Sequence, residues 1–443
     1  MRKSLIIATL WLMALGSLHA GPDAPVEMIV RASSGKISAI AQRHGLVVVR
    51  SISDGRGLFL LRTNSGSWDA VHAEMDADPD VANCEQNAIV NLPEARTGRL
   101  NQSTAAILEA LPDRTLVSYF DRLVWRGYVL QPAATIIKIA EAQKQYSSGG
   151  GIVAIIDTGI DDRHPALAGG IVPGYDFIRD QNGIPSDTQD LAQSTAAILE
   201  GGDTGGVFRA ARVNQSTAAI LEQSTAAILE ARGLPPAFGH GTMVAGLVRL
   251  VAPSASIMPL RAFTSDGSAS TADILSAIYW AVDHGANVIN MSFSMVAPSD
   301  ELLRALNYAN DSNVIAVASA GNAGLETTAY PAAYRHVIGV GSTNNLDVRS
   351  TFSNYGSGLV RLAAPGEALI TPFPGGAYAA VWGTSFSAAL VSGGASLVVD
   401  TFSGIDPARA DQQLIRTRKV SPELGLGRLD LLEALRRMTI VKR

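Results

Sequence analysis

The stretch Gly383-Thr384-Ser385-Phe386-Ser387-Ala388-Ala389 runs directly into the apolar residues 390–399 and decides the fold class of this chain. The helical pattern that follows Ser385 predicts that its backbone N–H lies at the start of a helix. The positive end of a helix favours developing negative charge, which suits the nucleophile of an acyl transfer. Because Gly-Thr-Ser also occurs in ordinary turns, the role of Ser385 depends on the rest of the chain.

A candidate catalytic carboxylate follows a predicted buried strand. Residues 152–156 form the continuous apolar run Ile-Val-Ala-Ile-Ile, typical of a strand buried on both faces, and Asp157-Thr158-Gly159 comes next. Open α/β sheets build their sites at the carboxyl ends of such strands. An aspartic-protease dyad needs a second Asp in the same setting, and the sequence contains none, so that chemistry is excluded.

A histidine between two glycines precedes the next predicted helix. His240 lies in Phe238-Gly239-His240-Gly241-Thr242, and apolar residues with helical spacing follow over 244–251. Glycines on both sides allow another backbone or a substrate to approach closely. We therefore interpret His240 as a candidate functional residue and not as an ordinary polar residue of the core.

The rest of the chain alternates predicted strands with predicted helices. Strands are predicted at 257–261, 287–292, 314–319 and 337–340, and helices at 271–284 and 301–312. This order predicts an α/β fold with a doubly wound parallel sheet covered by helices. Ala320-Gly321-Asn322 follows the third of these strands, and Asn322 is either a turn residue or an amide that donates to an oxyanion.

Four motifs carry a resemblance to a known family. They are Ile156-Asp157-Thr158-Gly159, Gly239-His240-Gly241-Thr242, Ala320-Gly321-Asn322 and Gly383-Thr384-Ser385, and His164-Pro165 fits as well. From about residue 127 to about residue 437 the sequence resembles the subtilisin-like serine peptidases, the subtilase family. The triad order Asp, His, Ser is the one known from subtilisin itself.

The resemblance implies a secreted serine endopeptidase that works through an acyl-enzyme. It makes Asp157, His240 and Ser385 the catalytic triad, with Asn322 and the N–H of Ser385 as the oxyanion hole. A catalytically inactive binding protein with the subtilase fold is the alternative function. Such a protein is expected to have lost a triad member, and here none is lost.

The resemblance also assigns residues to substrate binding. Ser292, Phe293, Ser294 and Met295 stand where the family usually has Ser-Leu-Gly-Gly, and Ala329 stands at a pocket-floor position that is often Gly. Side chains in place of glycines are expected to narrow the cleft or to change how an extended peptide pairs with it. Ala329 is expected to make the first pocket smaller.

Residues 21–92 are expected to form a small α+β domain of their own. Strands are predicted at 26–31, 46–52, 57–63 and 81–92, and helices at 35–44 and 68–75. This is the β-α-β-β-α-β order of a split βαβ sandwich. By resemblance, the domain is the inhibitory propeptide of a proenzyme. Residues 93–127 are then a linker, and residues 128–437 are the subtilisin-like catalytic domain.

Residues 1–20 have the pattern of a secretory signal peptide. Arg2 and Lys3 precede an apolar segment that ends in small residues at Ala20. We expect a protein that is secreted or periplasmic after cleavage, and an N-terminal anchor that is kept is the alternative. A formal net charge of −5 gives no support for nucleic acid as a partner. A single cysteine, Cys84, excludes an intrachain disulfide.

An octapeptide, Gln-Ser-Thr-Ala-Ala-Ile-Leu-Glu, occurs four times, at residues 102–109, 193–200, 215–222 and 223–230. Its uneven spacing excludes a solenoid, which needs a fixed period. Identical copies in predicted linker and loop positions indicate insertions that the surface tolerates. A binding role for the copies is the alternative.

Two departures from the family pattern concern metal binding. Ala166 stands where the family usually has an Asp, and residues 248–251 run into Ala252-Pro253 without the usual loop. In the family both features supply oxygen ligands to a structural Ca²⁺, so we expect no calcium at this site. We also expect no other metal and no cofactor. The expected partners are a protein or peptide substrate and the chain's own propeptide, and the protein is expected to be a monomer.

Overall fold

The structure is a computed structural model that describes residues 25–64, 67–93, 113–190 and 234–436. The predicted signal peptide and the four octapeptide copies lie outside these residues. The chain forms two compact units, residues 1–87 and residues 88–443, and each is described by itself.

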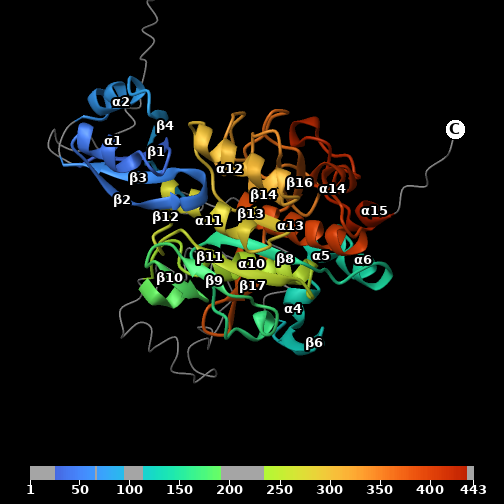
Figure 1. Cartoon of the computed structure of the whole chain (residues 1–443). Helices are drawn as coiled ribbons and strands as arrows, with labels where there is room; N and C mark the ends of the chain where they lie inside the picture. Colours follow the sequence, from blue (N-terminus) through green and yellow to red (C-terminus); the bar gives the residue numbers. More distant parts are fainter. Residues whose placement is uncertain (1–24, 65–66, 94–112, 191–233, 437–443) are drawn as a thin grey trace, which may run out of the picture. The chain divides into compact units, whose positions relative to one another are not determined.

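The first unit is an antiparallel sheet with two helices (Figure 1). Its elements are β1 (Glu27–Ala32), α1 (Ile37–Arg43), β2 (Leu46–Ser53), β3 (Leu58–Thr63), α2 (Trp68–Asp76) and β4 (Val81–Gln86), and the strand order is β2-β3-β1-β4. The core joins strand residues such as Met28 and Leu61 to helix residues such as Ile40 and Met75. The element order agrees with the sequence prediction, but the last strand ends at Gln86 and not at residue 92.

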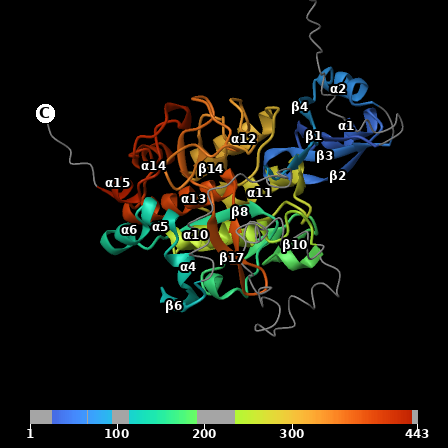
Figure 2. The ribbon, with the colours of Figure 1, turned by 180° about the vertical axis from the view of Figure 1, so that it is seen from behind.

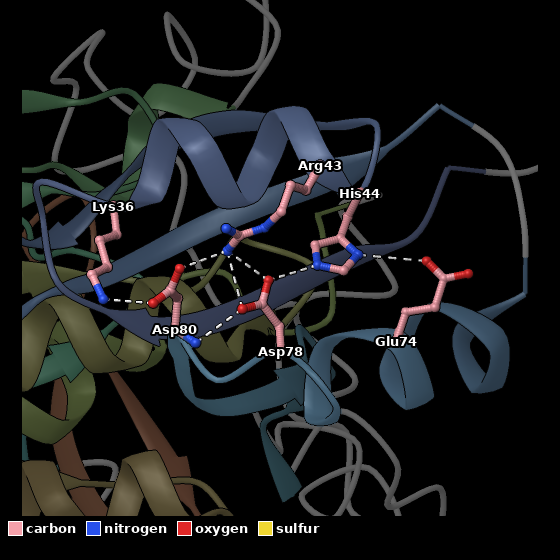
Figure 3. A network of polar contacts seen from close by, with 6 residues as sticks. All are labelled: Lys36, Arg43, His44, Glu74, Asp78 and Asp80. Carbon is pink, nitrogen blue, oxygen red and sulfur yellow. Dashed lines mark hydrogen bonds and ion pairs between the residues drawn. The ribbon is translucent and has the colours of Figure 1, made fainter.

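An ion-pair network connects α1 with the turn that follows α2 (Figure 3). Asp78 is at its centre and accepts hydrogen bonds from Arg43 (2.8 Å) and from the His44 ring (2.8 Å). Asp80 joins Arg43 and Lys36 to the same network. Asp78 is buried, so its carboxylate needs hydrogen-bonding and charged partners, and the network supplies them.

The second unit is built on an eight-stranded sheet, which confirms the predicted α/β class. Its strands are β8 (Ile152–Asp157), β9 (Gly174–Asp176), β10 (Gln181–Gly183), β11 (Ser256–Arg261), β13 (Val288–Met291), β14 (Ile315–Ser319), β15 (Val337–Thr343) and β16 (Leu362–Pro365). They lie in the order β10-β9-β11-β8-β13-β14-β15-β16. All neighbours from β9 to β16 pair in parallel, and β10 is antiparallel to β9.

Helices cover both faces of this sheet. α10 (His240–Val251) leads from β8 to β11 in one direction, whereas α11 (Thr271–Asp283) and α12 (Asp300–Asp311) lead through β13 to β14 in the other. Because such crossovers are right-handed, α10 lies on one face, and α11 and α12 lie on the other. Both ribbon views show α12 and α10 on opposite sides of the strands (Figure 2). The chain reverses direction across the sheet at β8, and open α/β sheets bind ligands outside the carboxyl ends of the strands at such a point.

The helix that begins at the Gly383-Thr384-Ser385 motif lies in the middle of the core. α13 (Thr384–Thr401) packs against α10 and β13–β16, and it is buried from Thr384 to Val398. Other elements of the unit are α4 (Arg126–Val129), α5 (Pro132–Ile136), α6 (Ile139–Gln145), β17 (Leu369–Phe373), β18 (Ala377–Val381), α14 (Pro407–Leu414) and α15 (Leu431–Leu435). None of the helices in the described part of the chain has both the length and the apolar character needed to cross a bilayer.

Part of the predicted linker is folded. β6 (Leu116–Tyr119) and β7 (Arg122–Trp125) form an antiparallel hairpin of the second unit. The hydroxyl of Tyr119 donates to the carbonyl oxygen of Leu250 in α10, at 2.5 Å. The sequence showed no clear period here, because partners 131 residues away, and not the local pattern, hold the hairpin in place.

Candidate active site

Asp157 and His240 meet at the carboxyl end of β8. Asp157 is the last residue of β8, and His240 is the first residue of α10. Nδ1 of the imidazole lies 2.8 Å from Oδ1 and 2.9 Å from Oδ2 of Asp157, and both residues are buried. Gly241 permits this approach, since a Cβ there would lie 2.0 Å from the carbonyl oxygen of Gly159. The carboxylate accepts the Nδ1 proton, which makes Nε2 the basic nitrogen of the neutral ring.

Ser385 lies in the first turn of α13, as the sequence predicted. Its hydroxyl donates to the carbonyl oxygen of Ser292 (3.1 Å), and the hydroxyl of Ser292 donates to the carbonyl oxygen of Ser385 (3.1 Å). The ring of the next residue, Phe386, packs on the ring of His240 with centroids 5.4 Å apart. The start of α13 is thereby held between His240 and the end of β13.

Asn322, in the loop after β14, is oriented by the residue before Ser385. Its Oδ1 accepts from the N–H (2.9 Å) and from the hydroxyl (2.8 Å) of Thr384. Asn354 holds the same loop, because its Oδ1 accepts from the N–H groups of Ala323 (3.1 Å) and Leu325 (3.2 Å). With its oxygen engaged in this way, the Asn322 amide has a fixed orientation beside Ser385. Neither Thr384 nor Asn354 has a local sequence signature for its role, so neither role was predicted.

The residues predicted to bind substrate have different environments. Ser292 contacts Ser385 as described, and the backbone of Met295 pairs with Tyr330 through bonds of 2.7 and 2.9 Å. Ala329, next to Tyr330, is buried. Phe293 is fully buried, and its ring packs on Phe263 with centroids 5.4 Å apart. Its side chain therefore belongs to the core and cannot narrow a cleft.

A short strand of the second unit runs in an extended conformation between β12 (Ser268–Ser270) and Ser294. β5 (Ile89–Asn91) pairs antiparallel with β12, and Asn91 forms an antiparallel bridge with Ser294. The N–H of Leu92 donates to the carbonyl oxygen of Gly267 at 2.8 Å. Two edges of the second unit, β12 and the segment after β13, thus bind an extended chain through its backbone.

A buried carboxyl group that the sequence analysis missed lies between the two halves of the site. Asp187 accepts hydrogen bonds from the hydroxyls of Thr158 (2.7 Å) and Thr242. Burial raises the pKa of Asp187 to about 7. Local sequence patterns do not reveal it, because its partners are 29 and 55 residues away.

Arginines lie in the region where the family pattern has its calcium ligands. Two guanidinium groups, those of Arg122 and Arg249, donate to the carbonyl oxygens of Ala168, Gly169, Pro253 and Ala255. His164 is a buried structural residue, since its ring bonds to the carbonyl oxygen of Ala377 (2.8 Å) and burial lowers its pKa. Over the described ranges, no three His, Cys, Asp or Glu side chains gather in a way that would hold a metal ion.

Comparisons of the sequence with known proteins find similar serine proteinases. The sequence model of the subtilase family matches residues 148–430. A thermophilic serine proteinase of Bacillus sp. (strain AK1) is 33% identical over 305 residues, which cover 66% of this chain and 66% of that protein. Thermitase of Thermoactinomyces vulgaris is 33% identical over 262 residues, which cover 59% of this chain and 79% of that protein.

The fold is also similar to solved structures. The crystal structure of fervidolysin from Fervidobacterium pennivorans, a keratinolytic enzyme related to subtilisin, has a TM-score of 0.65 at 20% identity, covering 94% of this chain and 61% of that one. A lanthipeptide protease has a TM-score of 0.54 at 22% identity, covering 70% of this chain and 93% of the other. The family match over most of the second unit and the identity to thermitase show that the chain belongs to the subtilase family, the subtilisin-like serine peptidases.

Proposed function

We propose that the chain is a secreted serine endopeptidase made as a proenzyme, with Asp157, His240 and Ser385 as its triad. The observation that carries the proposal is the buried hydrogen bond between Asp157 and His240, with the start of α13 packed on the imidazole ring. Protein or peptide is the substrate class. No observation favours the alternative of an inactive binding protein.

In the proposed reaction, Nε2 of His240 takes the proton of the Ser385 hydroxyl while Oγ attacks the peptide carbonyl carbon. The carbonyl π electrons move to the oxygen, and the amide of Asn322 and the N–H of Ser385 stabilise the resulting oxyanion. The C–N bond then breaks as His240 returns the proton to the amine. Water then attacks the acyl-enzyme by the same two steps, which release the second product and free Ser385. Asp157 holds the His240 tautomer and stabilises the imidazolium.

The first step requires a rotation of the Ser385 side chain. Its hydroxyl donates to Ser292 in this structure, so the hydroxyl has to turn toward Nε2 of His240 before the attack. Catalytic hydrogen bonds commonly reach their working geometry only in the substrate complex. The hydrogen bond from the Ser385 hydroxyl to the carbonyl oxygen of Ser292 joins two neutral groups. The imidazole of His240 is a stronger base than that carbonyl oxygen, so it is the better acceptor for the hydroxyl proton.

The extended track of residues 89–92 supports the proenzyme part of the proposal. A peptide substrate adds a strand to an exposed edge, and β5 with Leu92 makes that kind of pairing with β12 and Ser294. We infer that residues 21–92 are an inhibitory propeptide whose last residues occupy the position of an extended peptide substrate, between β12 and Ser294. Maturation then cuts the chain between residues 91 and 128. The signal-like pattern of residues 1–20 supports secretion or release into a periplasm.

A fluorophosphonate probe tests this function directly. We expect the probe to label Ser385 of the purified chain, and we expect Ser385→Ala to abolish both labelling and peptide hydrolysis. Ser396→Ala, which changes a serine on α13 bonded to the backbone of Gly150, is the matched control and should keep both. Mass spectrometry of the secreted N-terminus then reports self-cleavage. Peptide hydrolysis by Ser385→Ala at the wild-type rate would refute the proposal.

A further inference from the structure

We propose that Asp187 is a positioning residue that holds the Asp157 turn and the start of the His240 helix in one arrangement. It does so as the shared acceptor of two threonine hydroxyls, Thr158 and Thr242. The inference rests on the triad of the proposed function and adds to it a residue that touches neither substrate nor reacting atoms.

The two threonines belong to the two halves of the site. Thr158 directly follows Asp157, and Thr242 stands two residues after His240. Asp187 begins a short 3-10 turn, and its Oδ1 and Oδ2 each accept one of these hydroxyls. Asp187, Thr158 and Thr242 are all at most 2% exposed, so water does not compete for these bonds.

Each hydroxyl also accepts a hydrogen bond from the opposite half. Oγ1 of Thr158 accepts from the N–H of Gly241, the residue after His240, at 3.1 Å. Oγ1 of Thr242 accepts from the N–H of Asp161, in the turn after β8, at 2.7 Å. The bonds therefore connect the turn to the helix twice, and both connections end on Asp187.

The group that accepts both hydroxyls has to be a carboxylate. A threonine hydroxyl carries one proton, so when its oxygen accepts a backbone N–H the proton still needs an acceptor. An ionised carboxylate offers one proton-free oxygen to each hydroxyl, whereas in an amide or a protonated carboxyl one of the two positions is a donor. Only ionised Asp187 completes both connections.

The charges around Asp187 explain why this arrangement depends on pH. Burial is the largest cause that raises its pKa to about 7, and the carboxylates of Asp157 and Asp161 on the β8 side raise it further. The hydroxyls of Thr242 and Thr158 act against this shift. α10 contributes the imidazole of His240, which bonds to Asp157. Above about pH 7 Asp187 is ionised and accepts both hydroxyls, and below that pH one of the two hydroxyls loses its acceptor.

Asp187→Asn tests the inference, because Asn has the size of Asp and the hydrogen-bonding groups of its protonated form. Near pH 9 we expect kcat for a peptide substrate to fall roughly tenfold. A displacement of a catalytic group by about 1 Å costs on the order of 100-fold, and the loss of one hydrogen-bond acceptor should cause a smaller displacement. KM should change less than about twofold, because no substrate contact is removed. The ratio of wild-type to variant kcat should approach about 1 near pH 5.5, where wild-type Asp187 is itself protonated.

Two controls separate positioning from a general loss of stability. Asp430→Asn removes another buried carboxylate, which forms a 2.5 Å ion pair with Lys138 and contacts no described residue of the site. This variant should lower the unfolding temperature without changing the pH profile of kcat. Thr158→Val removes one connection and Thr158→Ser keeps it, so serine should restore the kcat that valine loses. This pair decides the question if Asp187→Asn does not fold.

The outcomes also distinguish the inference from the proposed function. A wild-type to Asp187→Asn ratio that is the same at all pH values, an unchanged kcat, or equal kcat for Thr158→Val and Thr158→Ser would overturn the positioning role. In each of these cases an inactive Ser385→Ala would leave the triad standing. If Ser385→Ala keeps its activity, the triad itself fails.

Discussion

The imidazole of His240 donates through Nδ1 to both oxygens of Asp157, at 2.8 and 2.9 Å, in an environment that leaves Asp157 1% exposed. The N–H of Thr158 adds a third bond to the same carboxylate at 2.8 Å. An acceptor held this firmly fixes both the tautomer and the plane of the ring, on which the proposed proton transfer depends.

Asp157→Asn is therefore expected to reduce kcat by roughly 10⁴-fold, because an amide at this position favours the wrong tautomer of His240. KM should stay within about twofold of the wild-type value, since substrate contacts are unchanged. Steady-state hydrolysis of a chromogenic peptide measures both constants. Asp311→Asn, at the exposed end of α12, is the control. A loss of less than about tenfold in kcat would contradict the assigned role of Asp157.

Asn322→Ala is expected to reduce kcat by about 10²–10³-fold with little change in KM. This is the range for the corresponding oxyanion-hole donor of subtilisin. Asn310→Ala on α12 is the matched control. Equal kcat for the two variants would contradict the proposed role of Asn322 in an oxyanion hole.

Asp78→Asn is expected to lower the stability of the first unit above about pH 4 and to flatten its response to acid. In the folded unit the N–H of Asp80, then His44 and Arg43, lower the pKa of Asp78 from 3.8 to about 2. A carboxyl group whose pKa is lower in the folded than in the unfolded chain stabilises the fold at pH values above its unfolded pKa. This contribution is lost as the pH falls from about 4 through about 2.

Hydrogen exchange of the β1 amides in a Ser385→Ala background measures this stability without self-digestion. Asp69→Asn, on the exposed side of α2, is the control and should exchange like its parent. The prediction fails if Asp78→Asn and its parent respond to acid with the same slope.

Arg249→Met is expected to destabilise the second unit by about 1–3 kcal/mol, because the buried carbonyl oxygen of Ala255 loses its charged donor and Gly169 keeps only Arg122. Burial and then the charge of Arg122 lower the pKa of Arg249 to about 10, so the group is still charged at neutral pH. Urea unfolding measures the change, with the exposed Arg335→Met as the control. A loss no larger than that of the control would show that the guanidinium is dispensable.

A chelator is expected to leave the unfolding temperature unchanged. Calcium needs about six to eight oxygen ligands, and in the region where the family pattern has its calcium ligands the carbonyl oxygens of Ala168, Gly169, Pro253 and Ala255 already accept guanidinium donors. Calorimetry with and without EDTA checks this. A fall of several degrees that added Ca²⁺ reverses would contradict it.

Much of the second unit is predictable because its signals are local. The apolar runs at residues 152–156 and 314–319 mark strands buried on both faces, and the structure contains them as β8 and β14. Ser385 and His240 could be assigned to helix starts from glycines and spacing alone. The strand predicted at 81–92 was too long, because β5 belongs to a different pairing from β4 although both read as β-rich.

The amino-acid sequence by itself determined the fold class, the family and the candidates Asp157, His240, Asn322 and Ser385, since short periods and short motifs encode them. Only the tertiary structure decided that the Phe293 side chain belongs to the core, that Thr384 orients Asn322, and that Asp187 joins two threonines from separate motifs. The physical reason is that a hydrogen bond or a ring contact depends on the distance between two atoms in space. Packing brings together residues tens to hundreds of positions apart, and no local pattern of apolar and polar residues records that distance.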